Sequence, residues 1–212
     1  MSRTTLLVPS GPEAAAVHRA QPPARVLEIP AGAAAALALP EFEPDETVIA
    51  LGLCGALWRM KAGDVAIYGR VVDATSSFEL EPSLVDELSG ALPGAKVVNA
   101  CTTRRVVTAV DARTVLAQRF NADVVDMEGT HLAAALAARG ARFAIVRVVS
   151  DDASRNLPPI EDAIDSDGRL QPWPIALAFA RAPLAALAFV RNTRAAMDVL
   201  TAVARAVSGV PA

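Results

Sequence analysis

Hydrophobic positions along the chain fall into short apolar runs separated by segments of helical period. The runs Thr5–Val8, Thr47–Leu51 and Phe143–Val149 are almost continuously apolar, which is typical of strands covered on both faces. Val26–Ile29 and Val124–Met127 are shorter runs of the same kind. We expect the third strand to break at its glycine turn, Gly52–Ala56, since glycine punctuates strands. Further β-branched stretches are predicted to be extended: Asp64–Tyr68, Arg70–Asp73, Ala95–Ala100 and Arg105–Val110.

Helices are predicted between these runs. Glu13–Arg19 forms a short helix, and Asp111–Phe120 a longer one with Asp111 as its N-cap. Thr130–Arg139 places apolar residues on one face and ends at Gly140, a good helix stop. The alanine-rich stretch Ala31–Leu39 is either a helix or a packed loop.

Strands that alternate with helices predict an α/β fold with three layers, in which helices flank a mixed, twisted sheet on both sides. At 212 residues the simplest organisation is a single domain spanning residues 1–212. After a proline-rich loop, the chain becomes helical from about residue 175.

Composition narrows the class of protein. Hydrophobic residues make up 53% and charged residues 20%, as in an ordered globular chain. A net charge of -3 with scattered basic residues argues against nucleic-acid binding. Cys54 and Cys101 make neither a disulfide framework nor a metal site, and nothing calls for a cofactor. No signal peptide is visible and Ile175–Val190 is too short and interrupted to span a membrane, so we expect a cytoplasmic protein.

Two acids stand where strands end. Glu128 follows Val124–Met127, and Asp151 follows the strand that ends at Ser150. In open α/β sheets ligands bind beyond the carboxyl ends of strands. An acid just past a buried strand is a candidate for a raised pKa and a proton-donating role. The alternative is that Asp151 caps a turn and Glu128 belongs to the first turn of a helix.

Three motifs resemble one family. Val-Val-Asp-Met-Glu-Gly (Val124–Gly129), then a helix, then Val-Arg-Val-Val-Ser-Asp (Val146–Asp151) is similar to the paired signature of the purine nucleoside phosphorylase and nucleosidase superfamily. Gly-Leu-Cys-Gly-Ala-Leu (Gly52–Leu57) and Ala-Gly-Asp-Val (Ala62–Val65) resemble its glycine turn and the strand after it. These motifs occur in the family's order and at plausible spacing, and together they cover most of the chain.

The resemblance implies a role for each matching residue. Glu128 would accept hydrogen bonds from the ribose hydroxyls and stabilise the positive charge that develops on the sugar, and Met127 would lie against the ribose. Asp151, preceded by Ser150, would protonate the purine N7 as a general acid. The base would be bordered by Cys54, Gly55 and Val106.

Departures from the family pattern concern the acceptor. Phosphorylases of this family hold phosphate with an arginine and a hydroxyl residue at positions that correspond here to Ala50 and Leu53. Neither side chain binds an anion, so water is the expected acceptor. Hydrolytic members activate water with a glutamate in the first turn. Alignment puts Ala16 there, and Glu13 is the nearby acid. Glu13 is either that base or a solvent-facing acid at a helix start.

The C-terminal part is similar to the hopanoid-associated phosphorylase branch, which is thought to release adenine from adenosylhopane. The resemblance rests on Pro158-Pro159, Asp167-Gly168-Arg169 and the arginine-rich end. It implies a lipid-linked substrate and a peripheral membrane contact. The other interpretation is that these helices close the core or form a subunit interface, since the family is usually oligomeric.

The leading hypothesis is therefore a nucleosidase that releases adenine from an adenosyl compound, with adenosylhopane as the candidate substrate. A phosphate-dependent purine nucleoside phosphorylase is the alternative within the same class. A nucleoside-binding protein without turnover is the alternative from another class.

Overall fold

The computed structural model of the chain describes residues 3–161 and 171–209. The Asp167–Arg169 stretch lies outside the described residues. The strands are β1 (Arg3–Pro9), β2 (Arg25–Ile29), β3 (Glu46–Ala56), β4 (Val65–Val72), β5 (Ser77–Glu79), β6 (Lys96–Thr102), β7 (Val124–Asp126) and β8 (Arg142–Asp151). The helices are α1 (Pro12–Arg19), the 3-10 helix η1 (Gly32–Ala38), α2 (Pro82–Ala91), α3 (Val110–Phe120), α4 (Gly129–Ala138), α5 (Pro172–Arg181) and α6 (Pro183–Val207).

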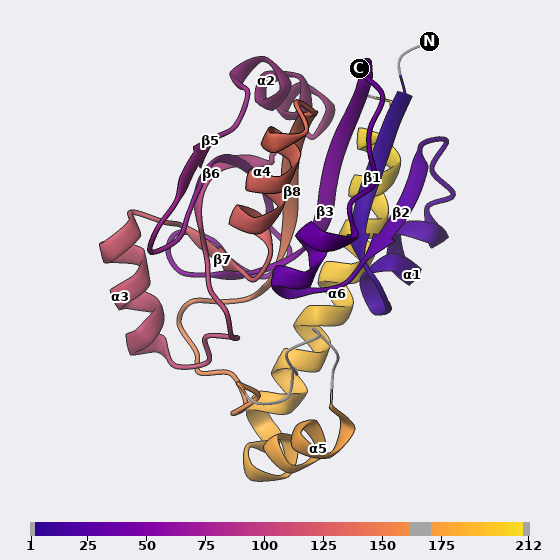
Figure 1. The fold of residues 1–212 in the computed structure, drawn as a ribbon. Coiled ribbons are helices and arrows are strands. Elements are labelled where there is room, and N and C mark those ends of the chain that lie inside the picture. The colour runs from indigo at the N-terminus through magenta and orange to yellow at the C-terminus, as the bar shows by residue number, and fades with distance from the viewer. Residues whose placement is uncertain (1–2, 162–170, 210–212) are drawn as a thin grey trace.

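The sheet is mixed, as expected. β1 runs parallel to β2 and β3, and β3 runs parallel to β8, whereas β7 pairs antiparallel with β3 and β8 antiparallel with β4. Because β4 also pairs with β6, and β6 with β7, the ladder closes on itself through β3, β8, β4, β6 and β7. This closed, barrel-like part is visible beside the open β1–β2 edge (Figure 1).

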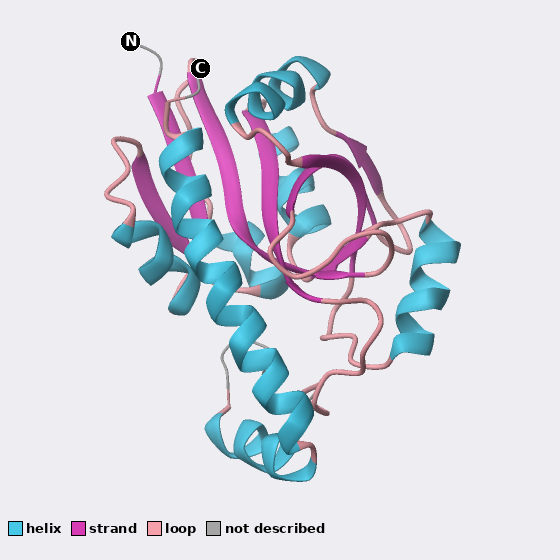
Figure 2. Cartoon of the chain, turned by 180° about the vertical axis from the view of Figure 1, so that it is seen from behind, coloured by secondary structure: helices cyan, strands magenta, loops and turns pink. Residues whose placement is uncertain are grey.

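Helices cover both faces of the sheet, which confirms the predicted layers. α6 packs against β8, β3 and α1 on one face, and α4 packs against β4, β6 and β8 on the other (Figures 1 and 2). The apolar runs of β1, β3 and β8 are buried between them, with Leu6, Ile49 and Ile145 fully enclosed. The start of α6 and the whole of α5 project below this body as an arm (Figure 2).

Three local predictions were wrong. The third strand does not break at Gly52: β3 continues to Ala56, because it pairs with β8 along Gly52–Cys54 and Gly55 pairs with Val125 of β7. Asp111 is not an N-cap, since α3 begins one residue earlier with Ala109 in that position. The predicted extended stretch Arg105–Val110 is an irregular loop that leads into α3.

No helix among residues 3–161 and 171–209 is long and apolar enough to cross a membrane.

Candidate active site

The acids singled out in the sequence lie next to strand ends. Glu13 is on the first turn of α1, directly after β1. Glu128 lies between β7 and α4, at the N-cap position of that helix. Asp151 is the last residue of β8, which pairs with β3 along most of its length. The topology therefore brings all three to the region around the second half of β3.

A buried arginine that sequence reasoning missed contacts one of these acids, Glu128. Arg147 of β8 is 1% exposed. Its Nη1 donates to the Leu51 carbonyl (2.7 Å), and its Nη2 lies 3.5 Å from Glu128 Oε2. Burial alone would lower the pKa of Arg147, but Glu128, Asp126 and other neighbours raise it, so the guanidinium stays charged. The sequence did contain a signal for this residue, because Arg147 is a charged residue inside an otherwise apolar strand and a buried charge needs a partner.

Glycine at position 52 lets this arginine and Glu13 reach the strand. A Cβ there would lie 2.1 Å from Arg147 Nη1 and 2.9 Å from Glu13 Oε1, both too close for any side chain. Glu13 and Arg147 therefore converge on the same piece of the β3 backbone.

Glu13 points its carboxylate inward, although the residue as a whole is partly exposed. Oε1 accepts a hydrogen bond from the Leu53 N–H at 2.7 Å. Burial, together with the negative charge of Glu128, raises the pKa of Glu13 from 4.5 to about 7, against the opposing effects of Arg147 and that hydrogen bond. A carboxylate with such a pKa is half deprotonated near neutral pH and can take up a proton.

Glu128 is held from two sides. Its Oε1 accepts a hydrogen bond from the Gly32 N–H at 2.8 Å, and its Oε2 faces Arg147. The residue is 7% exposed, and burial raises the pKa of its carboxyl, while Arg147 acts in the opposite direction. Met127, beside it, is partly buried.

Asp126, which sequence reasoning also missed, holds the end of β7 in place next to Glu128 and Arg147. Its carboxylate accepts hydrogen bonds from Tyr68 Oη (3.2 Å), Thr102 Oγ1 (2.8 Å) and the Gly129 N–H (3.1 Å). Its Oδ2 lies 3.7 Å from Arg147 Nε. The end of β7 is thereby tied to β4, β6 and the start of α4, which places Glu128.

Asp151 lies with three of its predicted neighbours. Ser150 Oγ is 2.7 Å from Asp151 Oδ1 and 3.1 Å from the Cys54 carbonyl. A Cβ at Gly55 would lie 3.2 Å from Asp151 Oδ2, so the carboxylate packs closely against this glycine. Arg113 Nη1 is 2.6 Å from Oδ2. Burial raises the pKa of Asp151, and the Arg113 charge opposes that effect.

A pocket of about 250 Å³ opens beside Asp151. It is bounded by the chain that follows β8, including Arg155, and by residues of α6 such as Leu184 and Phe189. Its volume is close to the lower end for ligand pockets, about 300 Å³. Val106 does not border it, but packs in a small apolar cluster that includes Phe189.

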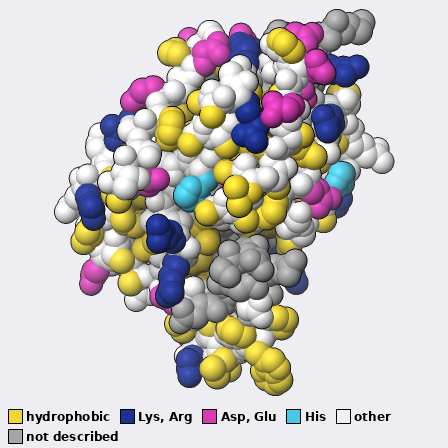
Figure 3. All heavy atoms as spheres, viewed as in Figure 1, with side chains coloured by type: hydrophobic (Ala, Val, Ile, Leu, Met, Phe, Trp, Pro, Cys, Tyr) yellow, Lys and Arg dark blue, Asp and Glu magenta, His cyan; other side chains and the backbone are white. Residues whose placement is uncertain are grey.

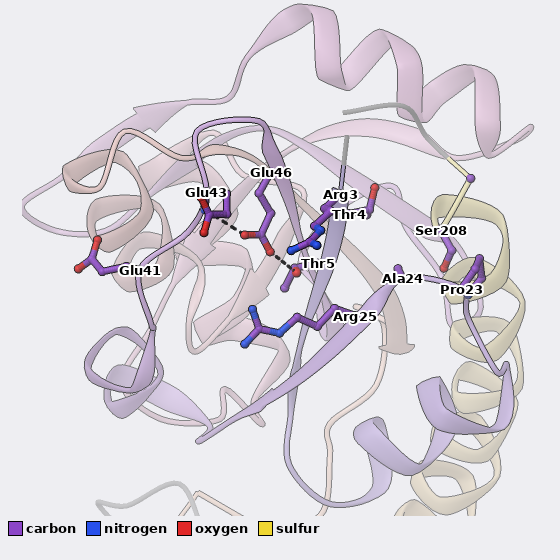
Figure 4. A pocket seen from close by; sticks show the side chains of 11 residues that line it. Arg3, Thr4, Thr5, Pro23, Ala24, Arg25, Glu41, Glu43, Glu46 and Ser208 are labelled. Carbon is purple, nitrogen blue, oxygen red and sulfur yellow. Dashed lines mark hydrogen bonds between the residues drawn. The ribbon is translucent and has the colours of Figure 1, made fainter. Parts of the chain in front are cut away.

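A larger cavity lies elsewhere. It has a volume of about 680 Å³ and is lined by charged residues at the starts of β1, β2 and β3, among them Arg3, Arg25 and Glu46 (Figure 4). Glu46 accepts hydrogen bonds there from Thr5 Oγ1 and the Glu43 N–H. These positions are at the amino ends of the strands, opposite the candidate acids, so this cavity is not the ligand site of an α/β sheet.

Comparisons with known proteins identify the family and the fold. Residues 29–170 match the model of the phosphorylase superfamily. A comparison with curated protein sequences finds no match.

Solved structures with the same fold include several nucleosidases. Native futalosine hydrolase of Helicobacter pylori superposes with a TM-score of 0.69 at 12% identity, covering 97% of both chains. The 5′-methylthioadenosine/S-adenosylhomocysteine nucleosidase of Neisseria meningitidis, in complex with methylthio-immucillin-A, gives a TM-score of 0.67 at 18% identity, covering 97% of this chain and 99% of that one. The S-adenosylhomocysteine nucleosidase of Streptococcus pyogenes, in complex with 5-methylthiotubericidin, gives 0.62 at 17% identity, covering 95% and 97%.

Proposed function

The chain belongs to the phosphorylase superfamily, and from this premise we propose that it is a nucleosidase that uses water to release adenine from an adenosyl compound. The observation that carries the proposal is the convergence of Glu13, Glu128 and Arg147 around Gly52, with Asp151 at the end of the neighbouring strand. Family membership and fold support an enzyme that breaks a glycosidic bond by hydrolysis or phosphorolysis.

Each acid has one task in this proposal. Asp151 protonates N7 of the base, so that the bond to the sugar breaks with its electron pair on adenine. Glu128 binds the ribose hydroxyls and stabilises the positive charge that develops on the sugar. Glu13, whose pKa is about 7, takes a proton from the attacking water.

The local charge supports water rather than phosphate as the acceptor. Glu13, Asp126 and Glu128 surround Arg147, so the acids outnumber the cation that an anion would need. Ala50 is buried inside β3, and the Leu53 N–H already donates to Glu13. A hydrated anion such as phosphate needs several free donors.

The test is adenine release from methylthioadenosine, adenosylhopane and inosine, each with and without phosphate. We expect release from an adenosyl compound at a rate that phosphate does not change. Strict phosphate dependence would identify a phosphorylase. Tight adenine binding with no release from any compound would refute the enzyme proposal and identify a binding protein.

The finer part of the proposal is a lipid-linked substrate, with adenosylhopane as the candidate. Its support is the arm formed by α5 and the start of α6, where Trp173 is 84%, Leu184 83% and Leu187 69% exposed. Hydrophobic side chains gather on this lower lobe (Figure 3). Residues 172–197 contain Arg181, Arg191 and Arg194 but no acidic residue. An apolar, basic surface with a tryptophan suits the interface of an anionic bilayer.

Leu184 also lines the pocket beside Asp151, so an apolar substituent leaving that pocket would run onto the arm. We expect the protein to sediment with vesicles of phosphatidylcholine and phosphatidylglycerol, and a Trp173→Ser/Leu184→Ser variant to stay in solution. Leu37→Ser is the control, since Leu37 is 89% exposed on η1. If wild type does not sediment with vesicles and is a dimer, whereas the variant is a monomer, the arm is a subunit interface.

A further inference from the structure

Arg113 is a buried cation that the proposed reaction has not used. It lies on α3 and is 1% exposed. Its Nε donates to the Val107 carbonyl (2.9 Å), and its Nη1 donates to the Asp152 carbonyl (3.0 Å). A fully buried guanidinium is costly unless a charge compensates it. The compensating charge is Asp151, whose Oδ2 lies 2.6 Å from Nη1.

This contact makes the two oxygens of Asp151 unequal. Oδ2 faces the guanidinium of Arg113, which carries only hydrogen-bond donors. A proton on Oδ2 would point at another donor, so a protonated Asp151 carries its proton on Oδ1. Oδ1 lies 2.7 Å from Ser150 Oγ, and that hydroxyl has a second acceptor in the Cys54 carbonyl at 3.1 Å. Ser150 can therefore donate to Cys54 while Oδ1 is protonated, and to Oδ1 once it is not.

We propose that Arg113 is a positioning residue that holds the Asp151 carboxyl by Oδ2 and leaves Oδ1 to carry the proton delivered to the base. This rests on the proposed function, in which Asp151 is the acid. The proton moves from Oδ1 to N7, the bond from the sugar carbon to the base nitrogen breaks, and its electron pair stays on the base. Asp151 is left as a carboxylate, which Arg113 stabilises from one side and the Ser150 hydroxyl from the other.

Other groups near Asp151 set the direction of the pH effect. Asp152, the next residue, carries a negative charge, and its Oδ1 accepts a hydrogen bond from the Ala62 N–H. The Cys54 thiol lies on β3, and Arg155 lines the same pocket. Arg113 is the cation in direct contact. Its loss therefore favours the protonated form of Asp151, and an opposite charge at this range changes a pKa by about 1–3 units.

The first experiment measures kcat/KM against pH for wild type, Arg113→Met and Arg113→Lys. The fall in activity at high pH marks the loss of the Asp151 proton. In Arg113→Met we expect that fall to move up by about 1–3 pH units, with a lower kcat because the product carboxylate loses its partner. Arg113→Lys is the matched control, and its fall should stay near that of wild type. A uniform loss in both variants, with no movement of the fall, would show a structural role only.

The second experiment does not depend on turnover. Carbon-13 NMR of the aspartate carboxyls, with Asp151→Asn to assign the signal, follows the titration of Asp151 directly. A higher midpoint in Arg113→Met supports the pairing even if wild type cleaves no nucleoside, in which case the proposed function alone fails. An unchanged titration midpoint of Asp151 in folded Arg113→Met overturns the positioning role of Arg113. If circular dichroism shows that Arg113→Met does not fold, Arg113→Gln replaces it, because the Gln amide still donates hydrogen bonds but carries no charge.

Discussion

Replacing Glu13 by Gln separates the energetic role of this residue from its chemical role. Gln has nearly the same shape, and its side-chain oxygen can still accept the hydrogen bond from the Leu53 N–H. What it removes is a carboxylate whose pKa is raised from 4.5 to about 7, mainly by burial.

The stability effect follows from proton linkage. Because the folded-state pKa lies above the unfolded one, ionisation of Glu13 opposes folding. This opposition is absent below pH 4.5, grows as the pH rises to about 7, and is constant above that. At about 1.4 kcal/mol per pKa unit the full effect is at most about 3–4 kcal/mol, and partial exposure of the residue reduces it.

We therefore expect Glu13→Gln to be as stable as wild type near pH 4.5 and more stable at pH 8, in urea unfolding followed by circular dichroism. Its kcat should fall by about 10²–10⁴-fold, because the water loses its base. In wild type kcat/KM should rise as the pH passes about 7, and the variant should lack this rise. Glu41→Gln, at an exposed glutamate, controls for a general charge effect. A variant that is no more stable at pH 8 than at pH 4.5, relative to wild type, would refute the burial argument; unchanged kcat would refute the base.

Three further substitutions test the rest of the site. Asp151→Asn should lower kcat by about 10²–10⁴-fold with an unchanged circular dichroism spectrum, and retained turnover would mean that another group protonates the base. Gly52→Ala should destabilise the protein by about 1–3 kcal/mol or more in thermal unfolding, because its Cβ would lie 2.1 Å from Arg147 Nη1. The matched control Gly90→Ala, where no atom lies within 4 Å, should stabilise α2 by about 0.5–1 kcal/mol. Arg147→Met should cost about 3–5 kcal/mol, and less at pH 5 than at pH 8, because Glu13, with a pKa of about 7, is ionised only at the higher value; an equal loss at both values would contradict the charge balance.

Local patterns predicted the elements well where burial decides them. The run Phe143–Val149 is part of β8, and the helix predicted over Thr130–Arg139 is α4, which begins and ends one residue earlier, at Gly129 and Ala138. The closure of the sheet through β8 was not predictable in this way. Closure depends on which strands pair. The hydrophobic pattern of β8 would be the same whether it paired with one neighbouring strand or with two.

The site was partly visible in the sequence. Glu128 and Asp151 follow strands, where ligands of α/β sheets bind, so the sequence alone singles them out. For Glu13 the sequence left a second interpretation, a solvent-facing acid at a helix start. Only the structure shows that its carboxylate points inward, to the Leu53 N–H. Arg113 did carry a signal: Leu116, Ala117 and Phe120 share its helical face and pack inward. An arginine on the buried face of a helix implies a buried acid, but the spacing does not say which one.

The structure also changes the reason for expecting water as the acceptor. In the sequence the reason is an absence, because Ala50 and Leu53 have no side chain that binds phosphate. In the structure the reason is occupation: the Leu53 N–H donates to Glu13, the Gly32 N–H donates to Glu128, and Arg147 already faces Glu128 and Asp126. Introducing an arginine at position 50 alone would therefore not create a phosphate site, since an incoming anion would still meet the carboxylates that hold these donors. Removing the Glu13 side chain would free the Leu53 N–H, but the same carboxylate is the base that the proposed hydrolysis needs.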